Sequence, residues 1–552
     1  MSRRLLTVFS AILLWIEAAA LPQLSERCYL VTDRDIYLAG DRIWCSAFCI
    51  DAASGKPSDS SAIAYACIAD EKEVRVTARI ALFGGRGSGY IDIPADLPTG
   101  NYSITAYTAL CRDEQGYDYS QGARCISIFN TSLTRKGNAE LCDTPAWPHY
   151  GTSLDGHIGL SLKQSGKPGQ KASLTLDSRL DCTASLSVSI SRCSGLPRPE
   201  RNEAAFSPAG GHSGTVLPEY EGEVIYALVE GPDREKVLSR EEVTAYISAI
   251  GERDDLYTGH CLPDGRVAFR TSNIFGDKEL VCEVDAEQGV DAHIRLCSPF
   301  AEFGLECPAL QLSAQMEDAL LELEPAPAAS YAAVCDSLIR SWREDLPLMP
   351  EDMVVYNLDD YNRFATMKEV FVEILPEVRS KGRGENARIE LLTLDGNGQN
   401  TGRWATSLVM IDGVPVFRHS RVMAFDAMNI SRIEVWRHAY RYGDRIYYGL
   451  INLVSKEGGI AFVDFGSNVR IVDFKGCCYP VSIGGAFNRE QNAPDRRELV
   501  LWLPVLTLEA SGTFTTDYTL PSRPGLYELS VEGLAEDGTH IFERTLLEIT
   551  EQ

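Results

Sequence analysis

Positive charge is scarce in this 552-residue sequence. Its 52 Lys and Arg residues stand against 78 Asp and Glu residues, which gives a formal net charge of −26 at pH 7. We find no cluster of basic residues of the kind that follows a row of phosphates. The acidic balance disfavours a nucleic-acid partner, and it disfavours an anionic membrane surface for the same electrostatic reason.

The motifs of common enzyme chemistries are also missing. The sequence has no HExxH zinc motif, no GxSxG nucleophile elbow and no GxxxxGK(S/T) phosphate loop. Its eight histidines lie far apart, and none has a partner at metal-ligand spacing. The glycine-rich stretch 84–89 lies between two predicted strands, which favours a hairpin loop. Residues 395–400 begin like a calcium loop but lack its glycine at the sixth position and its closing glutamate, which favours a turn.

From these absences we predict no catalytic residue, no metal site and no cofactor. A hydrolase whose site is assembled from distant residues would leave no motif, and it stays open as an alternative.

Long apolar runs are absent after the start of the chain. Residues 1–20 have the features of a secretory signal peptide: Arg3 and Arg4, an apolar stretch, and small residues at 18–20 that suit cleavage. The apolar stretch of about ten residues is too short to span a bilayer. No cysteine follows at the position that lipid anchoring requires. We expect an exported chain without a transmembrane segment.

The 16 cysteines are scattered rather than spaced as a disulfide framework. Cys45 and Cys49 share one face of a predicted strand, where residues four apart are about 13 Å from each other, too far to bridge. The adjacent Cys477 and Cys478 would be strained if they paired together. We interpret most of the cysteines as small buried apolar residues and leave the pairing open.

Alternating strands and turns dominate the pattern, so we predict a mainly β, multidomain chain. An opening element, a turn followed by an alternating strand, occurs at 38–48 and again at 166–177. A closing element, a Pro/Gly turn followed by a strand, occurs at 98–107 and again at 521–533. In each closing element an aromatic residue follows two positions after the glycine, where a Tyr hydroxyl can reach a backbone acceptor. The predicted β-sandwich regions are 26–130, 155–297 (one unit, or two divided near Pro218) and a C-terminal immunoglobulin-like sandwich at 460–552.

The order of the pieces in 26–130 resembles the second macroglobulin-type domain of the alpha-2-macroglobulin family, an immunoglobulin-like sandwich. The matching parts are residues 37–43 and 98–102. The reactive thioester of that family needs a Gly-Cys-Gly-Glu-Gln run. Residues 476–479 begin similarly but lack the acyl-donating Gln. The resemblance therefore implies the sandwich fold without covalent trapping.

Residues 408–456 predict an α+β module. Leu408 to Ile411 have the pattern of a buried strand, and Asp412-Gly413 suits a tight turn that needs positive φ. Two further strands are predicted at 430–436 and 448–456. Upstream, Thr366 and Glu369 form a capping box at the start of a helix with one apolar face.

These motifs resemble the plug domain of TonB-dependent outer-membrane receptors, and the resemblance covers residues 351–456. In that family an Arg-Gly-Pro turn usually follows the Ile-Glu-Val strand; here the residues are Arg437-His438-Ala439, so we expect an altered turn. Glu434 should point away from its neighbours in the strand and form a structural ion pair. The receptor barrel of about 22 strands needs more residues than follow this module, so we expect no pore. The matching signature residues are Ile411, Asp412, Gly413, Val414, Pro415, Ile433, Glu434, Val435, Gly449, Asn452 and Lys456.

Two connecting segments complete the predicted organisation: a linker at 131–154 and a helical linker at 298–350, with an apolar helical stripe at 328–344. The resemblances imply a non-enzymatic, exported cell-envelope protein of a gram-negative bacterium, in the periplasm or associated with the outer membrane. In this hypothesis the plug-like module docks to an outer-membrane protein or a surface lipoprotein of a transport or secretion component. The alternative is a surface adhesin or glycan-binding protein, in which exposed Trp147, Trp404 or Trp502 would stack on sugars.

Overall fold

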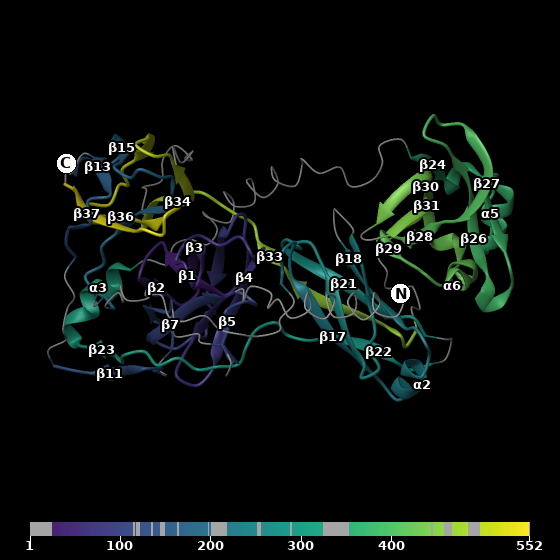
Figure 1. Cartoon of the computed structure of the whole chain (residues 1–552), viewed down its shortest axis with the longest axis horizontal. Coiled ribbons are helices and arrows are strands. Elements are labelled where there is room, and N and C mark those ends of the chain that lie inside the picture. Colours follow the sequence, from purple (N-terminus) through teal and green to yellow (C-terminus); the bar gives the residue numbers. More distant parts are fainter. Residues whose placement is uncertain are drawn as a thin grey trace, which may run out of the picture. The chain divides into compact units, whose positions relative to one another are not determined.

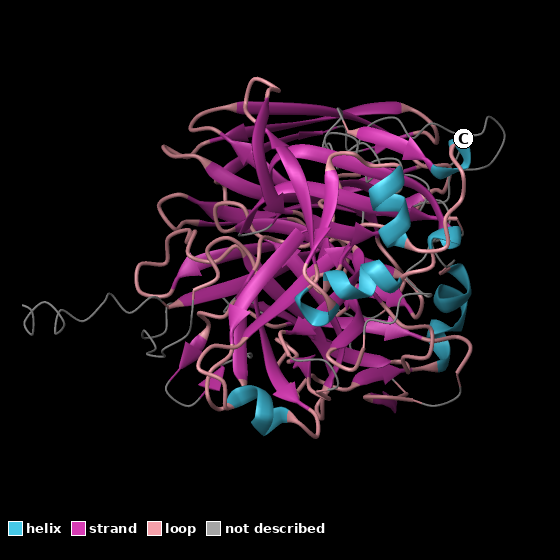
Figure 2. Ribbon diagram, turned by 90° about the vertical axis from the view of Figure 1, so that its right-hand side faces the viewer, coloured by secondary structure: helices cyan, strands magenta, loops and turns pink. Residues whose placement is uncertain are grey.

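Strands dominate the computed structural model (Figure 2), so the chain is a mainly β, multidomain protein, as the alternating pattern predicts. The structure describes residues 25–113, 116–117, 122–133, 136–143, 150–162, 165–196, 198–199, 218–250, 255–286, 290–323, 353–442, 445–456, 466–483 and 497–550. The predicted signal peptide and the predicted helix at 328–344 lie outside these residues. Two compact units are present: Met1–Gly222 with Phe300–Val334 and Cys477–Gln552, and Glu223–Pro299 with Cys335–Gly476.

The first sandwich of the first unit consists of two sheets, in the orders β1-β3-β6 and β2-β10-β7-β4-β5-β33 (Figure 1). Apolar residues that alternate along these strands meet between the sheets, among them Leu30, Ile68 and Ile104, because successive side chains of a strand point to opposite faces. In the glycine-rich stretch 84–89, Gly84 and Gly85 form the predicted hairpin turn between β5 and β6, and residues 86–89 already belong to β6. The strands are β1 (Glu26–Thr32), β2 (Ile36–Leu38), β3 (Arg42–Asp51), β4 (Ile63–Ala69), β5 (Val74–Ala81), β6 (Arg86–Asp92), β7 (Gly100–Tyr107), β10 (Arg124–Phe129) and β33 (Cys477–Cys478), with a small hairpin of β8 (Arg112–Asp113) and β9 (Gly116–Tyr117).

The second sandwich of this unit is built from two distant parts of the chain. β15 pairs with β35, and β16 lies between β34 and β36. The sequence pattern predicts separate sandwiches at 155–297 and 460–552, and this division is wrong because strands from the two regions pair in one sandwich. Neither of the two parts supplies enough strands to cover both faces of a core by itself. The strands are β12 (Ser153–Leu154), β13 (Ile158–Leu162), β14 (Ser165–Gly166), β15 (Lys171–Ser178), β16 (Ala184–Arg192), β34 (Leu499–Leu508), β35 (Thr513–Thr519), β36 (Gly525–Ala535) and β37 (His540–Ile549).

Both closing elements contain the predicted tyrosine contact. The Tyr102 hydroxyl donates to the Pro98 carbonyl at 2.7 Å, and the Tyr527 hydroxyl donates to the Arg523 carbonyl at 3.0 Å. Each contact fixes the turn that precedes the strand, so the repeated sequence pattern corresponds to a repeated structure.

An extended segment, residues 300–312, crosses the outer face of the larger sheet of the first sandwich. Phe300 packs edge-on against Tyr65, with ring centroids 5.7 Å apart, and the Cys125–Cys307 disulfide fastens the segment to β10. The prediction of a helical linker at 298–350 is wrong for this stretch, because its side chains bury against the sheet rather than against one another. The segment ends in β23 (Leu310–Leu312), which pairs with β11 (Ala139–Leu141), and is followed by η2 (Ala314–Met316) and α3 (Glu317–Glu322).

The second unit contains a further sandwich, with sheets in the orders β20-β17-β22 and β19-β18-β21-β32. Here too a strand arrives from far along the chain, since β32 pairs with β21. The elements are β17 (Val224–Glu230), α2 (Arg234–Leu238), β18 (Thr244–Ile250), β19 (Asp255–His260), β20 (Arg266–Arg270), β21 (Asp277–Val284), β22 (His293–Leu296) and β32 (Val469–Lys475).

The rest of the second unit is the α+β module, with a five-stranded sheet in the order β24-β30-β31-β28-β29 and a three-stranded sheet β25-β26-β27. The predicted capping box of Thr366 and Glu369 is present, and Met367, Val370 and Phe371 are buried on one face of α5. The elements are β24 (Val354–Asn357), η3 (Leu358–Asp360), α5 (Met367–Glu373), β25 (Val378–Lys381), η4 (Gly384–Asn386), β26 (Arg388–Leu394), β27 (Asn400–Thr406), β28 (Leu408–Ile411), β29 (Val414–Pro415), α6 (His419–Ala424), η5 (Ala427–Asn429), β30 (Ile430–Tyr442) and β31 (Arg445–Ser455).

No helix in the described part of the chain is both long and apolar enough to cross a membrane.

Candidate functional site

The predicted signature residues meet at one end of the five-stranded sheet of the α+β module. Asp412 and Gly413 turn the chain from β28 into β29 with φ of 50° and 82°. β28 runs parallel to β31, so that Met410 lies opposite Asn452. Asn452 in turn lies opposite Glu434 of β30. Residues from three separate motifs therefore lie on neighbouring strands.

A chain of hydrogen bonds connects them. The Gly413 N–H donates to Asn452 Oδ1 at 3.1 Å, and Asn452 Nδ2 donates to Glu434 Oε2 at 2.9 Å. The Ser455 N–H donates to Asp412 Oδ1 at 2.8 Å. Arg432 Nε donates to Glu434 Oε1 at 2.8 Å, which is the ion pair expected for Glu434. Both carboxylates are thus occupied in holding the turn.

The remaining signature residues serve the core or the backbone. Gly449 has φ of 113°, and a Cβ there would lie 2.3 Å from Leu391 Cδ2, so only glycine lets β31 pass β26. Lys456 is exposed, and its N–H donates to the Asn429 carbonyl at 2.8 Å. The core residues of the signature, each at most 1 % exposed, are Ile411, Val414, Ile433 and Val435; Pro415 of β29 is also buried.

The prediction of an altered turn at Arg437-His438-Ala439 is wrong, because the chain does not turn at these residues. These residues belong to β30, which continues to Tyr442 and changes register with β31 between Trp436 and Ala439. A β-bulge takes up the extra residues and lets the hairpin extend. The substituted motif therefore lengthens the strand rather than turning the chain.

The extended hairpin presents an exposed apolar face, formed by Ala439, Ile446 and Tyr448. Ile446 and Tyr448 stand on either side of Tyr447 in β31, so their side chains point to the same face of the strand. The exposed fraction is 64 % for Ile446 and 58 % for Tyr448. Ala439 lies opposite Tyr448 and is also exposed. Contiguous apolar side chains in water are a common feature of binding surfaces.

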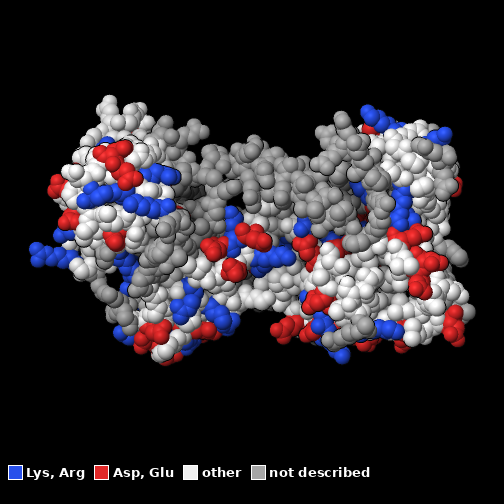
Figure 3. Space-filling view, turned by 180° about the vertical axis from the view of Figure 1, so that it is seen from behind, with Lys and Arg blue, Asp and Glu red and all other residues white. Residues whose placement is uncertain are grey.

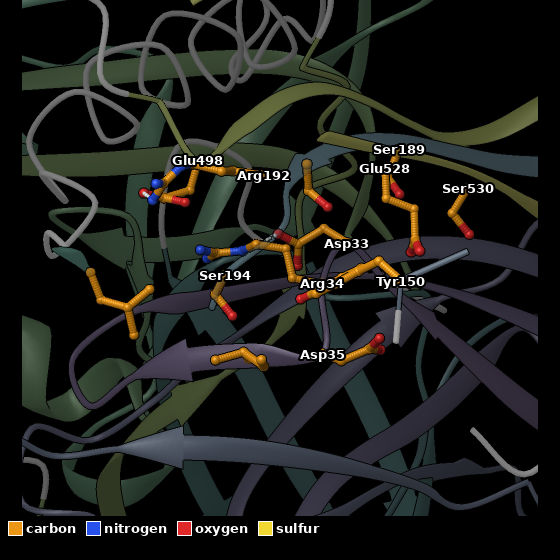
Figure 4. A pocket seen from close by; sticks show the side chains of 13 residues that line it. Asp33, Arg34, Asp35, Tyr150, Ser189, Arg192, Ser194, Glu498, Glu528 and Ser530 are labelled. Atoms are coloured by element: carbon orange, nitrogen blue, oxygen red, sulfur yellow. Dashed lines mark hydrogen bonds and ion pairs between the residues drawn. The ribbon is translucent and has the colours of Figure 1, made fainter. Parts of the chain in front are cut away.

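A second place of interest is a cavity of about 30 Å³ in the first unit (Figure 4). Asp33, Arg34, Arg192 and Glu498 are among the residues that line it. Burial raises the pKa of Asp33 and of Glu498, while neighbouring arginines oppose the shift. The volume suffices for about one or two water molecules and for no metabolite.

The acidic side chains at this cavity are paired. Arg34 Nε lies 3.1 Å from Asp33 Oδ2, and Arg523 Nη1 lies 2.7 Å from Glu498 Oε1. This buried charge cluster joins the two sandwiches of the first unit. Sequence reasoning missed the cluster, because its members are far apart in the chain and share no motif. They are Asp33, Arg34, Asp35, Asp41, Arg124, Arg192, Arg198, Glu498, Arg523, Glu528, Glu532 and Arg544.

The two candidate sugar-stacking residues that the structure describes, Trp502 and Trp404, are covered wholly and on one face, respectively. Trp502 is fully buried in the second sandwich. The guanidinium of Arg379 lies over the Trp404 ring at 4.3 Å from its centroid. Trp147 lies outside the described residues. The structure therefore offers no support for glycan stacking at the two tryptophans it describes.

Within the described residues, no three His, Cys, Asp or Glu side chains are grouped so as to hold a metal ion. Asp395 Oδ1 accepts from the backbone N–H groups of Asn397 and Gln399, so residues 395–400 form the predicted turn. Burial raises the pKa of the Cys67 and Cys282 thiols to about 12, which keeps them protonated and unreactive. Basic and acidic side chains are interspersed on the face shown in Figure 3.

These features define a multidomain β-sandwich protein that carries an α+β module. No protein-family model matches the chain, and no similar curated protein was found. Solved structures with a similar fold include a Salmonella alpha-2-macroglobulin (10 % identity, TM-score 0.23, 97 % of this chain and 40 % of that one). Another is an Escherichia coli alpha-2-macroglobulin activated by porcine elastase, at 11 % identity and a TM-score of 0.24, where the match covers 96 % of this chain and 44 % of that one. An Escherichia coli adhesin matches over 48 % of this chain and 61 % of its own, at 10 % identity and a TM-score of 0.15.

This chain spans less than half of the length of the two macroglobulins. The matched structures are β-sandwich proteins, as this chain is, and at these TM-scores they carry no argument about domain arrangement or function.

Proposed function

We propose that this protein is a non-enzymatic, exported component of a gram-negative cell envelope, located in the periplasm or at the outer membrane. Its α+β module binds an outer-membrane protein or a surface lipoprotein of a transport or secretion component. The resemblance of residues 351–456 to receptor plug domains motivates the setting. A binding role also suits a module whose signature carboxylates are used to hold its own turn.

One observation carries the proposal: the exposed apolar face at the hairpin of β30 and β31. Ile446 and Tyr448 stay in water although most apolar side chains of this module are buried. Such a surface suits a partner that presents an apolar patch of its own.

The proposal is tested by capture of partners from detergent-solubilised envelopes with the tagged mature protein. We expect the native chain to retain a barrel protein or a lipoprotein, identified by mass spectrometry. The double variant Ile446→Thr and Tyr448→Thr should lose it, since threonine preserves the strand while removing the apolar face.

A matched control is Phe83→Thr, which removes an exposed aromatic side chain of the first unit (59 % exposed) and should leave capture unchanged. Equal capture by the native chain and the hairpin variant would contradict docking through this face. Absence of any barrel protein or lipoprotein from the native sample would contradict the proposed function itself.

A further inference from the structure

Two thiols face each other across the first two long strands of the first sandwich. Cys28 of β1 and Cys49 of β3 are direct partners in the antiparallel register. The Cys49 N–H donates to the Gly85 carbonyl at 2.7 Å, and the Cys49 carbonyl accepts from the Ser58 N–H at 2.9 Å. Both backbone groups of Cys49 therefore point away from β1. This makes Cys28 and Cys49 a non-hydrogen-bonded pair of the ladder.

That position brings the side chains close enough to bond. The Cα atoms of a non-hydrogen-bonded pair lie about 4.5 Å apart, inside the range that disulfides span. Both residues are free cysteines in the structure, and they are 2 % and 1 % exposed. Cys45 and Cys67, on the same sandwich, lie opposite Thr32 and Thr77 instead.

We propose that Cys28 and Cys49 form a disulfide in the exported protein, in addition to Cys125–Cys307. The two thiols give up two protons and two electrons to a disulfide donor, such as glutathione disulfide or an oxidoreductase disulfide, which leaves as two thiols. The exchange takes place while the chain folds, because the closed sandwich keeps both sulfur atoms from any donor.

The bond would fasten the first strand of the described chain. β1 is otherwise held by its ladder to β3 and by hydrogen bonds of Glu26, whose N–H donates to the Leu110 carbonyl and whose carboxylate accepts from the hydroxyls of Ser58, Ser61 and Thr108. A covalent link between β1 and β3 would add to these contacts, mainly by constraining the unfolded chain. This inference is independent of the proposed docking function.

The test refolds the reduced, unfolded full chain in a glutathione buffer rich in the disulfide form. Free thiols are then alkylated under denaturing conditions, and the bonds are mapped by mass spectrometry. We expect a Cys28–Cys49 link, with Cys125–Cys307 as the internal control for oxidation and an alkylated Cys67 as the control for specificity. The variant Cys49→Ser should leave Cys28 alkylated.

Cys111 is the competing thiol, because it packs against the same core cluster as Cys28 and Cys49. The variant Cys111→Ser should therefore keep the Cys28–Cys49 link. Alkylated Cys28 and Cys49 in the refolded native chain, or a bond from either of them to Cys111, would overturn the proposal. Cys49→Ser should also lower the melting temperature of the oxidised protein but not of the protein refolded under reducing conditions.

Discussion

Glu543 shows how a single residue can make the stability of this protein depend on pH. Its side chain is fully buried, and the negative charge of the Asp155 carboxylate acts on it. Burial and the neighbouring Asp155 raise the pKa of Glu543 to about 7, whereas the pKa of Asp155 is lowered. Glu543 Oε1 also accepts from the N–H groups of Gly156 and Ile158 at 2.9 and 3.0 Å. Glu543 is therefore the member of the pair that holds the proton.

We expect this pair to lower stability as pH rises through neutrality. Between the ordinary value of 4.5 and about 7, the native state keeps a proton that the unfolded chain has released. The free energy of unfolding therefore falls across this range. Glu543→Gln keeps an oxygen that can accept from the N–H groups of Gly156 and Ile158 but has no proton to lose. Between about pH 5 and about pH 8, the melting temperature of the native chain should fall by a few degrees more than the melting temperature of the variant. Parallel losses would contradict this role.

At the scale of elements, local patterns predicted local structure. The Asp412-Gly413 hairpin, the capping box of Thr366 and the tyrosine contacts each depend on residues within a few positions of one another. The pairing of 153–192 with 499–549 was not predictable in this way. Alternation indicates which face of a strand is buried but not which strand lies beside it. The buried charge cluster could not be predicted from the sequence for the same reason, because most of its ion pairs join residues that are far apart in the chain.

Gly449 allows a direct test of how β31 passes β26. In Gly449→Ala the new Cβ would collide with Leu391 Cδ2, and the backbone would keep a φ that alanine rarely adopts. The strain costs about 1–3 kcal/mol, and overpacking costs about as much again. Hydrogen exchange in the full chain should become markedly faster in 445–455 and 388–394. Gly396→Ala, where a Cβ meets nothing within 4 Å, is the matched control. Unchanged exchange in Gly449→Ala would show that the close approach does not constrain the strand.

At the scale of the molecule, the first unit depends on charges that are out of water. Arg198 Nε donates to Asp35 Oδ2 of the first sandwich at 2.9 Å. Its Nη1 and Nη2 donate to the Glu528 carboxylate of the second sandwich at 2.8 and 3.1 Å. All three side chains are at least nine-tenths buried. A buried pair of this kind adds little net stability when complete, yet its loss leaves carboxylates without compensation.

Arg198→Met should therefore destabilise the first unit by about 3–5 kcal/mol, because Asp35 and Glu528 lose the cation they share and Arg544 approaches Glu528 only at 3.9 Å. Urea unfolding followed by hydrogen exchange of β1 and β36 reports on this unit alone. Combining Arg198→Met with Asp35→Asn and Glu528→Gln should recover much of the loss, since no charge is then stranded. Arg266→Met removes an exposed pair with Asp264 and should leave the stability nearly unchanged. A triple variant no more stable than Arg198→Met would mean that the arginine acts through packing, and not by neutralising the carboxylates that join the sandwiches.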